Sequence, residues 1–123
     1  LPPMVETEAL MARDMGRGAF YKAVAPDGRI VGTVRSRMED GTCHVARLAV
    51  HPDWQNRGLG TRLLEAAEAA FPDAERYELF TGHRSEKNLY LYRKHGYREF
   101  RRESVSETTD LVYMEKPGPG RNP

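Results

Sequence analysis

The sequence of 123 residues contains few of the residues that cross-link a protein or anchor it in a membrane. Its single cysteine, Cys43, excludes an internal disulfide framework and a cysteine-based zinc site, and suits a reducing cytoplasm. No stretch approaches the ~20 apolar residues of a membrane-spanning helix, so we expect no membrane partner and a cytoplasmic location. An excess of one charge is also missing, because 19 Lys and Arg offset 18 Asp and Glu, and a net charge of +1 makes nucleic acid an unfavourable partner. Any anion-binding site must therefore be local.

The composition that is present describes one folded domain. Hydrophobic residues make up 39% and charged residues 30% of the chain, and a chain of this length supports one hydrophobic core. The chain begins at Leu1 rather than with methionine and shows no signal peptide. We interpret residues 1–116 as a single α+β domain that is truncated at its N-terminus. Residues 117–123, rich in proline and glycine, are expected to form a disordered tail.

Hydrophobic spacing and turn residues predict the order of the elements. The strongest signal is a helix that starts near Gly58, in which Leu59, Leu63, Ala67 and Ala70 recur at helical spacing. Good helix formers predict a second helix over residues 6–16, and a third over 85–95 ends at Gly96. The remaining segments are expected to be strands, at residues 19–24, 29–35, 42–50, 77–81, 97–103 and 111–116.

The loop before the central helix has the composition of an anion site. Its residues 55–61 read Gln-Asn-Arg-Gly-Leu-Gly-Thr, between a predicted strand and a predicted helix. Free backbone N–H groups at a helix start attract anions, and Gly58 and Gly60 allow a close approach. A phosphate or pyrophosphate is the natural ligand of such a loop. The alternative interpretation is a helix start that needs its glycines only for tight packing. A dinucleotide fingerprint fits badly because Leu63 stands at its third glycine position, and the Gly-Lys-Ser/Thr ending of a Walker loop is missing.

Two motifs in this order resemble the GNAT acetyltransferases. Residues 55–60 resemble the family's Q/R-x-x-G-x-G/A coenzyme A loop, and residues 88–97 resemble its helix ending in L-Y-x-x-x-G-F/Y. The resemblance implies a mixed, centrally splayed β-sheet flanked by helices, acetyl-CoA as co-substrate in the splay, and transfer of an acetyl group to an amine. The predicted helix over residues 6–16 leaves no room for the family's first strand and helix, so we expect both to be missing.

The resemblance also assigns residues to the site. The tyrosine four residues before the motif's glycine, here Tyr92, donates to the leaving sulfur, and the alternative is a core aromatic residue. Helical spacing puts Ser85 and Asn88 on the same face as Tyr92, although Asn88 could equally be a solvated polar residue. The expected coenzyme A contacts are Leu48, Ala49, Val50, Gln55, Asn56, Arg57, Gly58, Leu59, Gly60, Thr61, Ser85 and Asn88. No metal site is expected.

The general base is the point at which this sequence departs from the family. Many members carry a glutamate at the position of Ala46. His44 lies two residues earlier on the same predicted strand, hence on the same face, and imidazoles in general suit proton transfer near neutral pH. The alternative for His44 is a partly buried structural histidine. Glu78 and His83 are reserve candidates.

Three functions are compatible with these residues. The leading one is an N-acetyltransferase acting on a small-molecule or protein amine, with a homodimer left open. The second is a non-catalytic coenzyme A-binding or sensing module, which the missing glutamate favours. The third is a nucleic-acid-directed acetylase, for which Arg98, Arg101 and Arg102 supply only a small basic cluster. An acyl-enzyme on Cys43 is disfavoured, because no activating motif accompanies this cysteine.

Overall fold

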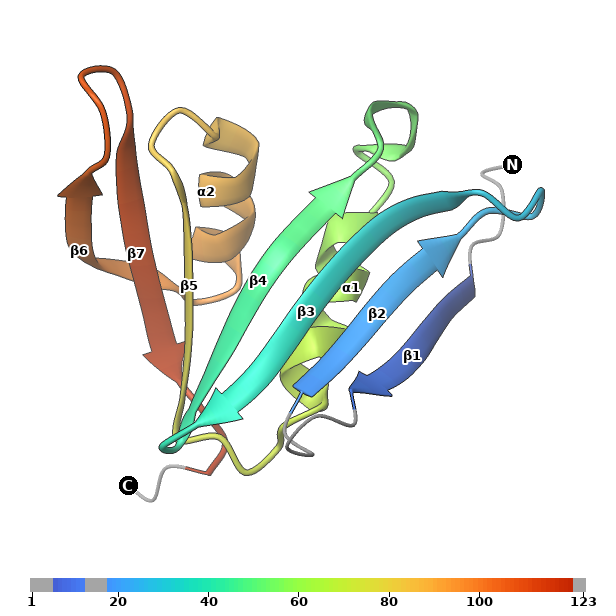
Figure 1. Ribbon diagram of the computed structural model, residues 1–123, viewed down its shortest axis with the longest axis horizontal. Helices are drawn as coiled ribbons and strands as arrows, with labels where there is room; N and C mark the ends of the chain where they lie inside the picture. Colours follow the sequence, from blue (N-terminus) through green and yellow to red (C-terminus); the bar gives the residue numbers. More distant parts are fainter. Residues whose placement is uncertain (1–5, 13–17, 121–123) are drawn as a thin grey trace.

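The computed structural model describes residues 6–12 and 18–120, and it shows one mixed β-sheet with helices on one side (Figure 1). The seven strands of the sheet are arranged in the order β1-β2-β3-β4-β5-β7-β6. Only β4 and β5 run parallel, and every other pair of neighbours is antiparallel. In chain order the elements are β1 (Glu6–Ala12), β2 (Gly18–Val24), β3 (Ile30–Glu39), β4 (Thr42–Val50), the short 3-10 helix η2 (Pro52–Trp54), α1 (Leu59–Ala69), β5 (Arg76–Gly82), α2 (Glu86–Lys94), β6 (Arg98–Ser104) and β7 (Asp110–Pro117).

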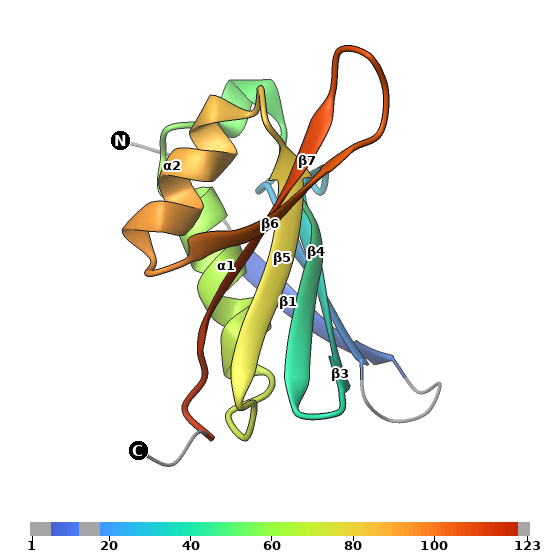
Figure 2. The same ribbon diagram turned by 90° about the vertical axis from the view of Figure 1, so that its left-hand side faces the viewer.

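Both helices cover the same face of the sheet (Figure 2). The apolar stripe of α1 supplies Leu63, Leu64 and Ala67, all fully buried, and these residues belong to one core with Val34 and Met114 of the sheet. Alternate residues of β3, β4, β5 and β7 point away from this core, toward the opposite face. Within the described residues no helix covers that face, so we call it the open face. None of these helices is long and apolar enough to cross a membrane.

The N-terminal segment differs from the prediction. The expected helix over residues 6–16 is wrong for residues 6–12, which form strand β1, and residues 13–16 lie outside the described part of the chain. Strand β1 pairs antiparallel with β2 over its whole length, from Glu6↔Val24 to Ala12↔Gly18. Backbone pairing along an available sheet edge outweighs a helix propensity of a few tenths of a kcal/mol per residue. Within the described residues before β2 there is therefore a strand and no helix.

The C-terminal segment is ordered further than expected. Pro117 ends β7 instead of beginning a disordered tail. The amide of Gly118 donates to the carbonyl of Glu75 at 2.8 Å, and the amide of Gly120 donates to the carbonyl of Ala74 at 2.7 Å. Residues 121–123 lie outside the described part of the chain.

The central pair of strands separates along its length, which confirms the predicted splay. Parallel pairing between β4 and β5 covers only Thr42↔Arg76, Cys43↔Tyr77 and His44↔Glu78, and beyond these residues the two strands diverge (Figure 1). On its other side β4 stays paired with β3, apart from a bulge at which Arg47 has a φ of +56°. The upper half of β4 therefore has one edge that no strand of residues 6–12 and 18–120 covers.

Candidate functional site

A cavity of about 510 Å³ lies where β4, the loop before α1 and helix α2 meet. We call it the loop cavity. All but two of the predicted coenzyme A contacts line it, the exceptions being Arg57 and Ser85. The predicted residues in its wall are Leu48, Ala49, Val50, Gln55, Asn56, Gly58, Leu59, Gly60, Thr61 and Asn88.

The start of α1 presents backbone N–H groups to this cavity. Gly58 caps the helix with a φ of +80°, a conformation that glycine adopts without strain, and no side chain caps the helix. The first-turn amides of a helix have no carbonyl partners within it, and the first turn of α1 has no acidic residue. A Cβ on Gly60 would lie 3.3 Å from the side chain of Leu91, so glycine also allows α1 to approach α2. The arrangement suits an anionic ligand.

Two lysines that the sequence reasoning missed add positive charge to the loop cavity. Lys87 and Lys94 of α2 both line it. The Nζ of Lys87 donates to Oε1 of Gln55 at 3.0 Å, and Nε2 of Gln55 donates to the carbonyl of Val50 at 3.1 Å. Gln55 therefore links the end of β4 to α2. Spacing of seven residues puts the two lysines on one helical face, which is the signal that could have identified them.

Two predicted contacts lie elsewhere. The Arg57 guanidinium stacks on Trp54, with its Cζ 5.1 Å from the ring centroid, and Trp54 is buried. Ser85 is the N-cap of α2 but makes no side-chain capping hydrogen bond. Neither Arg57 nor Ser85 belongs to the wall of the loop cavity.

Tyr92 of α2 is 3% exposed, and its ring centroid lies 5.9 Å from that of Tyr97. Burial raises the pKa of Tyr92 to about 12, so its hydroxyl keeps its proton at neutral pH. Among the described residues this hydroxyl has no hydrogen-bond partner, whereas the hydroxyl of Tyr97 donates to Oε2 of Glu68 at 2.7 Å. Asn88, on the same face as Tyr92, lies 3.5 Å from Thr81 (Nδ2 to Oγ1). Tyr92 lines neither the loop cavity nor the cavity on the open face, and it offers a hydroxyl donor that no described residue uses.

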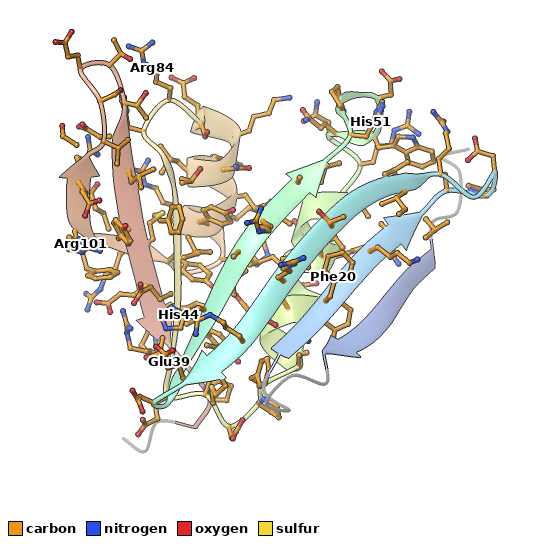
Figure 3. The ribbon with its side chains drawn as sticks, in the orientation of Figure 1. Phe20, Glu39, His44, His51, Arg84 and Arg101 are labelled. Carbon is orange, nitrogen blue, oxygen red and sulfur yellow. The ribbon has the colours of Figure 1, made fainter. Side chains whose placement is uncertain are left out.

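A second cavity, of about 850 Å³, lies on the open face of the sheet. We call it the open-face cavity. Its wall includes residues 18–20 of β2, 35–39 of β3, 44–47 of β4 and 78–80 of β5, together with Tyr113 of β7. Figure 3 shows Phe20 on β2 and His44 near the end where β4 and β5 meet. Because residues 44–47 line this cavity and residues 48–50 line the loop cavity, the two meet along β4.

The candidate bases fall into two groups. His44 lies in the open-face cavity with Ala46, and its Nδ1 is 3.8 Å from Oε2 of Glu78. Glu78 is also held by Arg76, whose Nη1 donates to its Oε1 at 2.8 Å. His83 lines neither cavity, and its Nδ1 accepts the amide hydrogen of Asp110 at 2.9 Å. The geometry brings His44 and Glu78 together and leaves His83 out.

Three further features considered in the sequence are Cys43, the basic cluster and a metal site. Cys43 is fully buried, and burial raises the pKa of its thiol to about 12, which leaves it inert. Arg101 pairs with Glu103 and Arg102 pairs with Glu99, each at 3.1 Å, so the basic cluster is largely neutralised. Among residues 6–12 and 18–120 no three His, Cys, Asp or Glu side chains come together as metal ligands.

Comparisons with known proteins agree with this architecture. A family profile described as the acetyltransferase (GNAT) domain matches residues 16–99, more than half of the chain. A search of curated proteins gives no match.

Solved structures show the same fold at low sequence identity. A GNAT family acetyltransferase from Elizabethkingia anophelis with acetyl-CoA bound is 19% identical, with a TM-score of 0.73 over 92% of this chain and 97% of the other. The IAA acetyltransferase from Bacillus cereus is 21% identical, with a TM-score of 0.73 over 93% and 99%. The ribosomal-protein-S18-alanine N-acetyltransferase from Escherichia coli is 16% identical, with a TM-score of 0.78 over 93% and 94%.

Proposed function

Because the chain belongs to the GNAT acetyltransferase family, we propose that it transfers the acetyl group of acetyl-CoA, its co-substrate, to a primary amine of a small molecule or protein by direct attack on the thioester. The observation that carries the proposal is the splay of β4 from β5 after His44. Beyond that point the edge of β4 faces no described strand, and β4 lines the open-face cavity with residues 44–47 and the loop cavity with residues 48–50.

The loop cavity is the binding site for the coenzyme. The amides at the start of α1 hydrogen-bond the pyrophosphate, and the positive end of the helix stabilises its charge. Lys87 and Lys94 add cations on the facing helix. The thioester then lies along the uncovered edge of β4, at Leu48, Ala49 and Val50. The amine enters from the open-face cavity.

At the centre, a nitrogen–carbon bond forms and the carbon–sulfur bond breaks. Main-chain N–H groups of β4 beyond His44 have no strand partner on the β5 side, so they can stabilise the negative charge that develops on the carbonyl oxygen. An alkyl ammonium with a pKa near 10.4 must lose a proton, which costs roughly 4.6 kcal/mol at pH 7. His44 lies four residues before Leu48, roughly 13 Å along the strand, so it accepts this proton through bound water; the carboxylate of Glu78, 3.8 Å from its Nδ1, stabilises the imidazolium.

Tyr92 hydrogen-bonds to the leaving sulfur. With a pKa of about 12, transfer of its proton to a thiolate with a pKa near 8.5 is uphill by roughly 5 kcal/mol. We therefore assign Tyr92 the role of a hydrogen-bond donor, and the thiolate takes its proton from solvent.

An acetylation assay tests this function. The chain is incubated with acetyl-CoA and a panel of amines, and acetylated product and free coenzyme A are both measured. Product formation supports the proposal, whereas tight binding of acetyl-CoA by calorimetry with no product supports the non-catalytic module, which Ala46 favours. His44→Ala should lower kcat/KM and remove the acid limb of its pH profile. His83→Gln, which keeps an acceptor for the Asp110 amide, is the matched control.

A further inference from the structure

We propose that the acceptor amine carries an anionic group, a carboxylate or a phosphate, which Arg35 and Arg47 bind in the open-face cavity. This inference rests on the proposed function, because it names the class of amine that the same site acetylates. It is carried by the pattern of charges in the cavity wall, by the backbone that places one of these arginines, and by the aromatic surface beside them.

Three arginines line the open-face cavity, and among the described residues only Arg37 has a carboxylate partner. Arg37 is bound by Glu39, with Nη1 2.9 Å from Oε2. Glu78, the other carboxylate of the wall, is held by Arg76. Among the described residues no carboxylate lies within 4.0 Å of Arg35 or Arg47. The cavity therefore contains two guanidinium groups whose charge no carboxylate of the described residues neutralises.

The two arginines are neighbours across the sheet. Arg35 of β3 is the Cα partner of Ala46 on β4, and Arg47 is the next residue. A partner distance of up to ~5.5 Å and one residue step of 3.8 Å put the Cα atoms of the two arginines within roughly 9 Å. Two flexible side chains at that separation can reach one carboxylate or phosphate together. Arg47 directly precedes Leu48, the first residue of β4 that lines the loop cavity.

The backbone at Arg47 is held in an uncommon conformation. Its φ of +56° is costly for a residue with a side chain, and it occurs at the bulge where β4 has one residue more than β3. The Oγ1 of Thr33 donates to the carbonyl of Arg47 at 3.3 Å and supports this geometry. Local strain of this kind concentrates at functional sites, and here it directs a guanidinium into the open-face cavity.

Aromatic rings beside the arginines supply an apolar contact for the rest of the acceptor. The Cζ of Arg35 lies 5.4 Å from the ring centroid of Phe20, which restrains the guanidinium before a ligand arrives. Phe80 and Tyr113, whose ring centroids are 5.3 Å apart, form the other side of the cavity. Phe80 is 52% exposed despite its size. The cavity thus fits an amine that has an anionic group and an apolar body.

Matched pairs of acceptors test the inference. We would measure kcat/KM at saturating acetyl-CoA, corrected for the free-base fraction of each amine, for phenylalanine against phenethylamine, leucine against isoamylamine, lysine against cadaverine, and phosphoethanolamine against ethanolamine. The first three pairs test a carboxylate and the last tests a phosphate. We expect at least one anionic member to be preferred tenfold or more over its neutral partner.

Variants identify the arginines responsible. Arg35→Gln and Arg47→Gln should each reduce the preference by tenfold or more, while the KM for acetyl-CoA stays within twofold. Arg37→Gln is the control, because this residue lines the same cavity on the same strand but already has a partner. Arg47→Asn, which tolerates a positive φ, replaces the glutamine variant if that chain fails to fold.

The outcomes separate the inference about the acceptor from the proposed function. Neutral amines used as well as anionic ones, a preference that survives the Arg35→Gln/Arg47→Gln double change, or an equal loss in Arg37→Gln would overturn the inference while leaving the proposed function intact. Binding of acetyl-CoA with no amine acetylated would overturn the inference and leave the non-catalytic module. Absence of both binding and turnover would remove the proposed function as well.

Discussion

Replacing Tyr92 by phenylalanine separates catalysis from stability in this fold. The ring of Tyr92 is buried against Tyr97, but its hydroxyl has no hydrogen-bond partner among the described residues. Removing the oxygen therefore breaks no bond of the folded chain and leaves no buried group unpaired. The free energy of unfolding should change by less than about 0.5 kcal/mol.

The expected loss of activity follows from the role assigned to the hydroxyl. A hydrogen bond to a charged atom is worth about 1.5–3 kcal/mol, which corresponds to a roughly 10- to 150-fold fall in kcat. Complete proton transfer by an acid catalyst would give a loss of 10²–10⁴. Because burial raises the pKa of Tyr92 to about 12, we expect the smaller range. The affinity for coenzyme A should stay within twofold.

Tyr97→Phe is the matched control. It removes a hydroxyl from the adjacent ring, but this hydroxyl donates to Glu68 at 2.7 Å. That variant should lose about 1–3 kcal/mol of stability and keep its kcat within twofold. Urea unfolding and steady-state release of coenzyme A measure the two effects. A Tyr92→Phe enzyme with full kcat would leave the residue as packing, and a loss of stability without a loss of kcat would reverse the assignment of the two tyrosines.

Three further predictions concern the loop cavity and two buried groups with raised pKa values, the Cys43 thiol and the Tyr92 hydroxyl. Gly58→Asp should bind coenzyme A at least tenfold more weakly than Gly58→Asn in calorimetry, because both side chains tolerate the positive φ and only one repels the pyrophosphate; equal affinities would exclude the loop as the site. Cys43, with its pKa raised to about 12, should react with iodoacetamide at pH 8 roughly 10³-fold more slowly in the native than in the unfolded chain, and fast alkylation of the folded protein would contradict its burial. Folding raises the pKa values of Cys43 and Tyr92, so the stability that their neutral forms contribute is complete below about pH 9 and is lost as the pH rises toward 12. The loss is at most about 1.4 kcal/mol per pH unit for each group. The urea concentration at the unfolding midpoint should therefore fall between pH 9 and 11, and it should fall less in Cys43→Ala.

The sequence identified those parts of the site that lie close together along the chain. The glycine loop, the helix that follows it and the end of β4 are continuous from residue 48 to 61, so one motif locates most of the loop cavity. His44 and Glu78 are neighbours because the parallel pairing of β4 with β5 ends at these two residues. The sequence could not show this pairing, but it identified both residues as candidate bases on predicted strands.

Features that depend on pairing between distant segments could not be predicted from the sequence. Residues 6–12 have the composition of a helix and form a strand only because β2 offers its edge. Arg47 gives no signal of its left-handed backbone, since the extra residue in β4 exists only relative to β3. Arg37 has a carboxylate partner, whereas Arg35 has none among the described residues, and this difference also becomes visible only once the side chains are placed.

The bulge in β4 explains how one strand serves both cavities. Before it, the odd residues Cys43 and Val45 are buried on the helix side, and His44 faces the open side. After it, the even residues Leu48 and Val50 pack against the core, so the extra residue has shifted the alternation by one. Without that shift the odd residues would continue to face the helices beyond Arg47. The extra residue thus brings Leu48 and Val50, rather than their odd-numbered neighbours, onto the core side of β4, at the level where we propose that acetyl transfer occurs.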